Sequence, residues 1–381
     1  TAKYQVLAIP DNVATYTTLA VSCDVDASST YVGSPTLVPP SGAVLVVSTG
    51  TEITFNVDNV SLYKTVIEDG ATLNVNYTDG HRLGIVEGTG NLRVTSDGTN
   101  ASLPAADYGT FLSCSGGGLE YAGNGSYSVL SGITELRNLA FSGSGERRFP
   151  NSNVEICEDF VVDGPTVDIL TNRRLIVYGN ALLQSGVLNA PSGNSARFNV
   201  FGDNFTITGG TFNGSSSGRT NIFQNMILAG GSLNVGTSSY RYRIGGDFTF
   251  TSGSFDGGSS NSIIEFLVFT SFGFTEDTNL TGDFTGSNAL GNVLIDKDGS
   301  GRSVNLFSDI EISGELDLTD GLVLSNGNDV TLGSSATVTP TIGRDDSYVA
   351  GKVVKTLSSS GSSFDFPIGN ASVWRPASPA L

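Results

Sequence analysis

The sequence predicts an all-β chain that folds as a parallel right-handed β-solenoid (β-helix), and three observations support this fold class. A short motif recurs along the chain at spacings of 21 to 24 residues. Within the copies, apolar and polar residues alternate, which is typical of a strand with one buried face. The chain has 49 Gly among its 381 residues and is rich in Ser, Thr, Asn, Val and Phe, which are not strong helix formers.

The first half of each repeat is a predicted strand that begins with Asn or Asp. Phe205 and Ile207 alternate with Thr206, so the two apolar side chains share the inner face. The first residues of the five aligned strands are separated by 21, 24, 21 and 22 positions. These strands are Asp159–Val162, Asn180–Leu183, Asn204–Ile207, Asn225–Leu228 and Asp247–Phe250.

The second half of each repeat begins with a glycine, which permits a bend without a Cβ penalty. An apolar residue and then Asn or Asp follow, in the copies Gly186–Asn189, Gly210–Asn213, Gly231–Asn234 and Gly253–Asp256. A weaker copy combines Asp309–Ile312 with Gly314–Asp317. Since so short a unit cannot bury its own apolar face, each copy must stack on the next as one turn, or rung, of a solenoid. We expect one buried ladder of Leu188, Phe212, Leu233 and Phe255, and a polar ladder of Asn189, Asn213, Asn234 and Asp256.

These patterns divide the chain into three predicted regions. Residues 56–344 form the solenoid. Residues 1–55 repeat poorly and are interpreted as an N-terminal β cap or linker that protects the first rung from edge pairing. Residues 345–381 are interpreted as the start of a further β module, truncated at the chain end. The first residue is Thr1 and no signal peptide is visible, so we expect a processed or trimmed segment. A β-sandwich is the competing fold, but repeats at fixed offsets favour the solenoid.

Composition excludes several functional classes. The chain carries 19 Lys and Arg against 37 Asp and Glu, a net charge of −18, whereas a nucleic-acid binder needs a basic face. It lacks the stretch of about 20 consecutive apolar residues that a membrane-spanning helix requires. It has one histidine, His81, which excludes a metal centre built from several histidines. We interpret His81, in a turn-like stretch, as a solvated surface residue.

One segment has the pattern of a metal loop. Asp296, Asp298 and Ser300 place oxygen ligands at alternate positions, and Gly301 allows a sharp turn, as in the first half of a calcium loop. The acidic residue expected to close such a loop is replaced by Phe307. The competing interpretation is a polar turn between two strands. Calcium is therefore a possible ligand of this segment, and we expect no other cofactor.

The cysteines Cys23, Cys114 and Cys157 are odd in number, so they cannot all pair within the chain. Cys114 and Cys157 are 43 positions apart, close to two rungs. At equivalent positions two rungs apart, Cα atoms are separated by about 10 Å, which is beyond the reach of a disulfide. The spacing therefore predicts buried free thiols.

The segment Tyr240-Arg241-Tyr242-Arg243 alternates strictly, so on a strand both tyrosines face one way and both arginines the other. Two interpretations remain open. The arginines are either a stripe that binds acidic glycans, or a solvated pair opposite two partly buried tyrosine rings.

Three groups of phrases carry a family resemblance. The first is Gly118–Tyr121, Leu136–Leu139 and Ser142–Pro150; the second is Gly291–Lys297, Ile312–Leu318 and Gly321–Leu324; the third is Tyr348–Lys355, Phe364–Gly369 and Trp374-Arg375-Pro376. They resemble the β-rich repeats of very large Bacteroidota cell-surface proteins, which include gliding-motility adhesins exported by type IX secretion. The resemblance covers roughly residues 85–381. It implies an extracellular, cell-surface location and type IX secretion components as partners, and it indicates no catalytic motif.

The sequence therefore predicts a non-enzymatic, extracellular structural or adhesive segment, a stiff stalk for adhesion or gliding motility. Surface glycans or other cell-surface proteins are the expected binding partners. The alternative is a carbohydrate-active β-helix enzyme, either a polysaccharide lyase or a glycosidase. Such an enzyme needs two carboxylates about 5–10 Å apart, or a basic residue beside calcium. Acidic residues here are scattered through turns, and none recur on one face at the repeat spacing.

Overall fold

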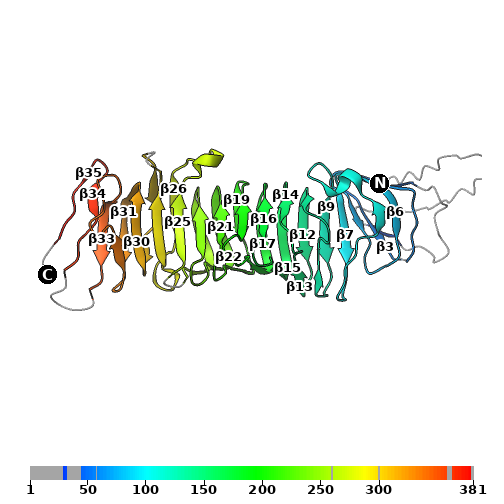
Figure 1. The fold of residues 1–381 in the computed structure, drawn as a ribbon, viewed down its shortest axis with the longest axis horizontal. Helices are drawn as coiled ribbons and strands as arrows, with labels where there is room; N and C mark the ends of the chain where they lie inside the picture. Colours follow the sequence, from blue (N-terminus) through cyan, green and yellow to red (C-terminus); the bar gives the residue numbers. More distant parts are fainter. Residues whose placement is uncertain are drawn as a thin grey trace, which may run out of the picture. The chain divides into compact units, whose positions relative to one another are not determined.

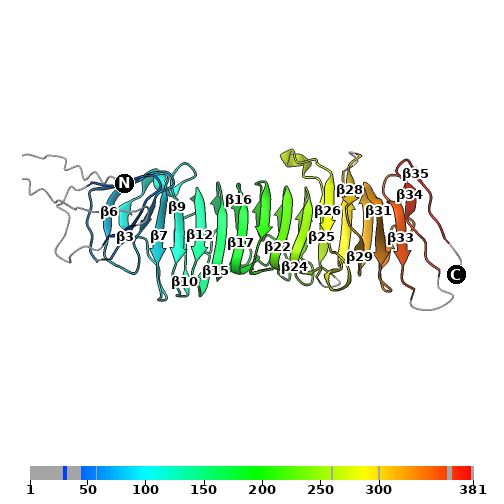
Figure 2. The same ribbon diagram turned by 180° about the vertical axis from the view of Figure 1, so that it is seen from behind.

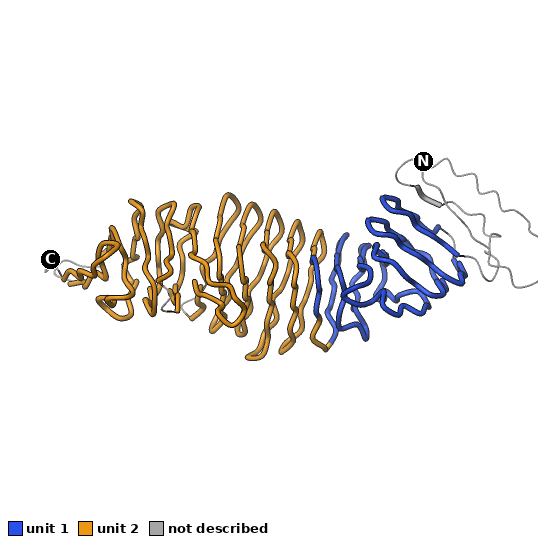
Figure 3. The backbone as a smooth tube through the Cα atoms, turned by 90° about the horizontal axis from the view of Figure 1, so that it is seen from above, with its two compact units in different colours: residues 1–150, 155–159 blue, residues 151–154, 160–381 orange. Residues whose placement is uncertain are grey.

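A computed structural model describes residues 29–31, 44–56, 58–258, 261–298, 301–357 and 363–378. These residues form strands β1 to β35 and the short 3₁₀ helices η1 (Gly109–Leu112), η2 (Thr270–Phe272) and η3 (Gly286–Asn288). Among them there is no helix with the length and apolarity needed to cross a bilayer. The chain forms two compact units (Figure 3): unit 1 holds residues 1–150 and 155–159, and unit 2 holds residues 151–154 and 160–381.

Unit 1 is a coil of parallel strands. β3 pairs with β5, and β5 with β7, while β4, which lies between β3 and β5 in sequence, pairs with β2 and β6 in a second sheet. The strands of unit 1 are β1 (Ser29–Tyr31), β2 (Val44–Val47), β3 (Glu52–Phe55), β4 (Lys64–Ile67), β5 (Thr72–Asn74), β6 (Arg82–Gly88), β7 (Asn91–Thr95), β8 (Ala105–Asp107), β9 (Gly118–Ala122), β10 (Tyr127–Ser128), β11 (Glu135–Leu136), β12 (Asn138–Ser142) and β13 (Glu146–Arg148).

Unit 2 repeats the same alternation between two sheets. The strand β14 (Val154–Ile156) includes residues of both units. The strands of unit 2 are β15 (Phe160–Asp168), β16 (Arg174–Val177), β17 (Ala181–Asn189), β18 (Arg197–Val200), β19 (Asn204–Ile207), β20 (Thr211–Asn213), β21 (Arg219–Ile222), β22 (Asn225–Asn234), β23 (Arg241–Ile244), β24 (Phe248–Asp256), β25 (Ile263–Leu267), β26 (Thr278–Gly282), β27 (Asn292–Asp296), β28 (Ser303–Leu306), β29 (Ile310–Ile312), β30 (Glu315–Asp320), β31 (Leu322–Leu332), β32 (Thr337–Thr339), β33 (Val349–Lys355), β34 (Ile368–Asn370) and β35 (Val373–Trp374).

The predicted parallel β-solenoid is confirmed. In unit 2 one sheet contains the parallel pairs β16–β18, β18–β21 and β21–β23, and the other contains β17–β19, β19–β22 and β22–β24. Figures 1 and 2 show these strands standing side by side from both faces. Because each parallel partner lies one whole turn away in sequence, every rung is hydrogen-bonded to the next along its strands.

The predicted core ladder is also confirmed. Leu188 pairs with Phe212, Phe212 with Leu233, and Leu233 with Phe255, and all four side chains are buried. The Phe212 ring contacts those of Phe198 and Phe205 at centroid distances of 6.0 and 5.4 Å. Similar side chains therefore pile over one another, and each apolar face is covered by the rungs above and below.

A ladder of side-chain amides follows the same register. Asn213 Nδ2 donates to Asn189 Oδ1 at 2.9 Å, and Asn234 Nδ2 donates to Asn213 Oδ1 at 2.7 Å. Asn189 Nδ2 in turn donates to the carboxylate of Asp168 at 2.5 Å. In all three bonds the residue of the later rung donates to that of the earlier rung. Each amide oxygen accepts a hydrogen bond from the amide of the following rung, and the carboxylate of Asp168 accepts the bond at the start of the ladder. This arrangement explains the Asn or Asp that ends each repeat.

The glycine of each repeat is required by both conformation and space. Gly210 and Gly231 have φ values of 69° and 64°, in the left-handed region that side chains disfavour. A Cβ atom on Gly231 would lie 2.4 Å from the carbonyl oxygen of Gly210, and one on Gly210 would lie 2.5 Å from that of Gly186. The glycines therefore stack, and each leaves room for the backbone of the preceding rung.

The weaker copy at residues 309–317 departs from this arrangement. In the clear copy of β17, both halves lie in one strand of one sheet. In the weaker copy, β29 pairs with β31, whereas β30 pairs with β27 in the other sheet. Ser313 and Gly314 lie at the corner between the two sheets. The weaker copy therefore resembles the other repeats in sequence but occupies a different place in the rung.

Parallel stacking extends beyond the predicted limits of 56–344. In unit 1, β1 pairs with β3 and β3 with β5, and in unit 2, β33 pairs with β31 and β34 with β33. The strand β35 is antiparallel to β34. Most of residues 1–55 lie outside the described part of the chain, so the cap remains a prediction, as does a further module from residue 345.

The core ladder can be tested by placing a single charge on either the inward or the outward face of β20. Phe212→Asp buries a carboxylate in the stacked core, and we expect it to lower the free energy of unfolding by at least about 3 kcal/mol. Thr211→Asp adds the same charge on the outward face of β20, and we expect a change within about 0.5 kcal/mol. Urea denaturation followed by circular dichroism measures both, and equal effects would contradict the assignment of the core.

Candidate functional site

The predicted calcium segment lies at the end of β27. Asp296 is half-buried and Asp298 is exposed with a φ of 53°, while Ser300 lies outside the described residues. Across the described residues, no group of three or more His, Cys, Asp or Glu side chains is placed to hold a metal ion. Calcium at Asp296, Asp298 and Ser300 therefore stays a prediction.

Lys297, between these two aspartates, has a structural role that the loop pattern does not indicate. Its side chain is buried, and its Nζ donates to Thr278 Oγ1 at 2.7 Å and to the carbonyl oxygen of Glu276 at 3.4 Å. Burial lowers the pKa of Lys297 to about 8, although the charges of Asp277 and Asp247 act in the opposite direction. The ammonium group thus joins the end of β27 to the start of β26 and the segment before it.

The prediction of buried free thiols is wrong for two of the cysteines. Cys114 and Cys157 form a disulfide in unit 1, with Cα atoms 5.3 Å apart, and Cys114 is exposed. The reason is unequal rung length. Asn91 on β7 pairs with Gly118 on β9, 27 positions later, but Gly118 pairs with Asn138, only 20 positions later. The longer rung contains η1 and the turn with Cys114, so Cys114 lies in an extended turn and not on a paired strand, and the regular strand spacing does not set its distance from Cys157. Cys23 lies outside the described residues.

His81 is not a solvated surface residue, as the turn-like sequence indicated; it is 4% exposed. Its Nδ1 accepts the backbone N–H of Val60 at 3.2 Å, and its Nε2 lies 2.7 Å from Thr78 Oγ1. Since the Thr78 hydroxyl donates to the carbonyl oxygen of Val75, Nε2 carries the hydrogen and the ring is neutral. Burial lowers the pKa of His81 below its ordinary value. Neither nitrogen is available for catalysis, although the ring lines a hollow of about 500 Å³ formed by residues 75–82, 94–97 and 100–105.

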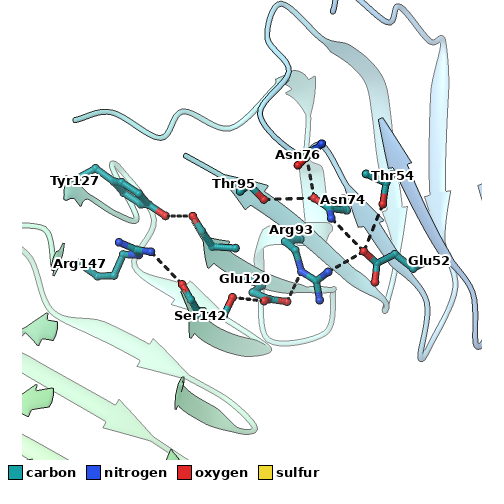
Figure 4. A network of polar contacts seen from close by, with 11 residues as sticks. Glu52, Thr54, Asn74, Asn76, Arg93, Thr95, Glu120, Tyr127, Ser142 and Arg147 are labelled. Carbon is teal, nitrogen blue, oxygen red and sulfur yellow. Dashed lines mark hydrogen bonds and ion pairs between the residues drawn. The ribbon is translucent and has the colours of Figure 1, made fainter. Parts of the chain in front are cut away.

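Two carboxylates lie at one cation in unit 1, around Arg93 (Figure 4). Arg93 bonds Glu52 through Nη1 and Glu120 through Nε, both at 2.7 Å. Asn74 Nδ2 donates to Glu52 at 3.1 Å, and Ser142 Oγ donates to Glu120 at 2.6 Å. One guanidinium therefore holds two acids from different rungs, and further donors occupy both acids. This geometry favours a polar clamp between rungs over a pair of acid and base.

Arg147 is a second structural cation, and its side chain is completely buried. Its guanidinium donates to the carbonyl oxygens of Gly125, Gly123 and Ser142 at 2.5 to 3.0 Å, and it lies 4.2 Å from the ring centroid of Tyr127. Burial lowers its pKa. In the sequence, Arg147 is one of two adjacent arginines and nothing distinguishes it from its exposed neighbour Arg148.

The alternating segment Tyr240 to Arg243 lies on β23 in unit 2. Both tyrosine side chains are buried, and their hydroxyls reach Thr220 Oγ1 at 2.6 Å and Met226 Sδ at 3.2 Å. Arg241 and Arg243 both form ion pairs with Glu265 of the next rung, whose side chain is 1% exposed. The tyrosines are thus more buried than predicted, and the arginines are anchored by an acid 22 or more positions away. The sequence pattern does not indicate Glu265 as a partner of the arginines, because it lies in the apolar run of β25.

The disulfide generates a prediction. It closes a loop of 43 residues, and its removal by Cys114→Ser is expected to destabilise unit 1 by about 2–4 kcal/mol. Cys23→Ser serves as the control, because it leaves the pair intact. Thermal melting measures the stabilities, and peptide mapping without reduction identifies the linked peptides. Unlinked peptides of Cys114 and Cys157 in the oxidised protein would show the assignment to be wrong.

The buried imidazole generates a second prediction. Because the folded pKa of His81 is lower than the unfolded value, the unfolded state binds the proton more tightly. The stability of unit 1 is therefore complete above about pH 6.5 and falls as the pH drops toward the folded pKa. His81 is the one histidine of the chain, so its pKa can be read from a single imidazole resonance in an NMR titration. A value at or above that measured in denaturant would contradict the buried, neutral ring.

Comparison with known proteins yields no match: no family model, no curated protein and no solved structure is significantly similar to the chain. The geometry of the two units is therefore the basis for the function of the chain. The resemblance to Bacteroidota surface repeats remains an expectation from the sequence.

Proposed function

We propose that the chain is a stiff, non-enzymatic structural segment of an extracellular cell-surface protein, serving as a stalk in adhesion or gliding motility. The observation that carries this proposal is the in-register stacking of rungs in unit 2. There the backbone pairing, the Phe212 ladder and the Asn213 ladder all join the same successive rungs. Bending such a stack breaks several kinds of contact at once, so a long segment of this type holds its direction.

The disulfide and the surface chemistry support an extracellular location. Disulfides persist in oxidising environments and are rare in the cytosol. The Cys114–Cys157 pair is partly solvent-exposed, so reducing conditions would reach it. A net charge of −18 and outward Ser, Thr and Asn side chains keep the rungs hydrated. Export by type IX secretion, and surface glycans or cell-surface proteins as partners, belong to the proposal through the sequence resemblance.

The alternative function is a carbohydrate-active β-helix enzyme. The acids Glu52 and Glu120 are its best candidates, because they flank one site in unit 1 (Figure 4). Both are bound to Arg93, and Asn74 and Ser142 hold them further. An acid in these contacts would have to leave its partners before transferring a proton, so the geometry favours the structural function.

Stiffness is tested by a distance measurement along unit 2. Thr166 and Ser254 are four rungs apart through the pairs at Val187, Thr211 and Ser232. With spin labels at Thr166→Cys and Ser254→Cys, in a Cys23→Ser background, we expect a narrow distance distribution near about 19 Å. Pulsed electron resonance measures it.

Two outcomes would overturn the proposal. A broad distribution between the labels would show that the rungs do not form a stiff stack. Release of reducing or unsaturated sugars from polysaccharides by the purified chain, abolished by Glu120→Gln, would establish the enzyme instead. Absence of sugar release, together with a narrow distance distribution, would support the structural function.

A further inference from the structure

Four strands of unit 2 each begin with an arginine, and the four arginines lie in register. Arg174 pairs with Arg197, Arg197 with Arg219, and Arg219 with Arg241, at the starts of β16, β18, β21 and β23. We name these four residues the arginine column. They alternate with buried residues along each strand, so they face outward. Neighbouring parallel strands are about 4.8 Å apart, so the column spans about 14 Å.

The arginine column concentrates positive charge in an acidic chain. Arg243, two positions after Arg241 on β23, lies beside it, so five of the chain's 19 Lys and Arg residues lie on this face. Among the residues that the structure describes, Glu265 neutralises one end of the column, where it pairs with Arg241 and Arg243. Within the described ranges, no carboxylate forms an ion pair with Arg174, Arg197 or Arg219.

The remaining contacts of the arginine column are to neutral groups. Arg197 Nη1 donates to the carbonyl oxygens of Asn194 at 2.9 Å and Ala196 at 2.6 Å. Arg219 Nε is buried and has no hydrogen-bond partner among the described residues. Burial, together with the charges of Arg243 and Arg197, lowers the pKa of Arg219 to about 10. The like charges therefore raise one another's energy, and a bound anion would relieve that cost.

An amide ladder runs beside the arginine column. Asn199 and Asn221 occupy the next outward position on β18 and β21, and Asn221 Nδ2 donates to Asn199 Oδ1 at 2.6 Å. Asn221 is 6% exposed, and its Oδ1 has no hydrogen-bond partner among the described residues. Since Asn221 pairs in register with Arg243, an unused acceptor lies between cations. Such a group suits a hydroxyl donor on a ligand.

Aromatic rings form the other side of the same face. Tyr178, Phe201 and Phe223 follow Arg174, Arg197 and Arg219 by four positions each. The rings of Tyr178 and Phe201 are stacked with centroids 5.3 Å apart, and those of Phe201 and Phe223 are stacked 3.9 Å apart. Tyr178 is 46% exposed, and Phe272 from η2, which contacts Phe223, is 58% exposed. The rungs of β16, β18 and β21 therefore carry an arginine at the start of the strand and a ring after its end, with the ring of Tyr178 exposed and that of Phe223 buried.

We propose that this face of unit 2 binds a linear acidic polysaccharide that runs along the arginine column, across the strands. The repeat of one arginine per rung is close to the length of one sugar, so successive carboxylates or sulfates meet successive guanidinium groups, which bind them in bidentate fashion. The amides bond sugar hydroxyls, and the aromatic rings supply an apolar edge for the sugar C–H faces. This site goes beyond the stiff-segment function and does not depend on it.

Nucleic acid is the competing polyanion, and the structure favours it less. Duplex DNA carries one negative charge per about 1.7 Å, and the excess acid of this chain repels so dense a charge more strongly. Bases also need open aromatic faces for stacking. Phe201 and Phe223 are stacked on each other at an interplanar angle of 12°, which leaves no face open between them.

The test compares three probes on the full chain: polygalacturonate, neutral dextran and duplex DNA, by calorimetry at low salt. The triple variant Arg174→Ser, Arg197→Ser and Arg219→Ser is expected to weaken polygalacturonate binding by at least about tenfold. The matched control Lys64→Ser, Arg148→Ser and Lys352→Ser removes the same charge elsewhere and is expected to change binding less than about twofold. Added salt should weaken binding by the parent chain more than binding by the triple variant.

Three results would overturn the proposal: polygalacturonate bound no more tightly than dextran, equal losses in the two triple variants, or DNA bound more tightly than polygalacturonate through the same arginines. Thermal melting checks that each variant is folded. If the arginine triple fails to fold, Arg174→Ser replaces it, because Arg174 is exposed and its removal leaves the core untouched; this single variant must then weaken binding at least threefold.

Discussion

The structure depends on one constraint, the register between each rung and the next. Parallel pairing places each residue beside the equivalent residue of the next rung. Phe212, for example, lies over Leu188. Each side chain must therefore pack or form hydrogen bonds with a similar side chain of the next rung. Apolar residues, amides and glycines satisfy this condition, because they attract or tolerate their own type, and each forms a ladder in unit 2.

Charged residues do not satisfy it without help, and the two units resolve the conflict differently. In unit 1, Arg93 lies between Asn74 and Glu120 in its column and also pairs with Glu52, so its charge meets two opposite charges. In unit 2, Arg174, Arg197 and Arg219 lie over one another without an acid. Stacked like charges are costly, and a column in which three of four arginines have no acidic partner among the described residues is the feature that most resembles a binding surface.

Stiffness and binding are compatible because they use opposite faces of the same strands. Along β18 the inward Phe198 and Val200 contribute to the core, while the outward Arg197 and Asn199 lie on the charged face. The core sets the spacing between rungs, and that spacing sets the distance between successive arginines. A solenoid of this kind therefore supplies a rigid, evenly spaced array without needing a pocket.

The sequence by itself determined the fold class, the clear repeats and the inner ladders, because a period of two and glycines at a fixed offset depend only on local geometry. It predicted which way Tyr240 and Arg241 face for the same reason. It did not determine contacts that depend on how long each rung is: one extended rung brings Cys114 to Cys157, and a buried turn encloses His81. The partners of Arg93, Arg147 and Arg241 lie on other rungs or at other turns. Only the tertiary structure decides these contacts, since the repeat spacing predicts which residues are neighbours on regular strands but not in extended turns.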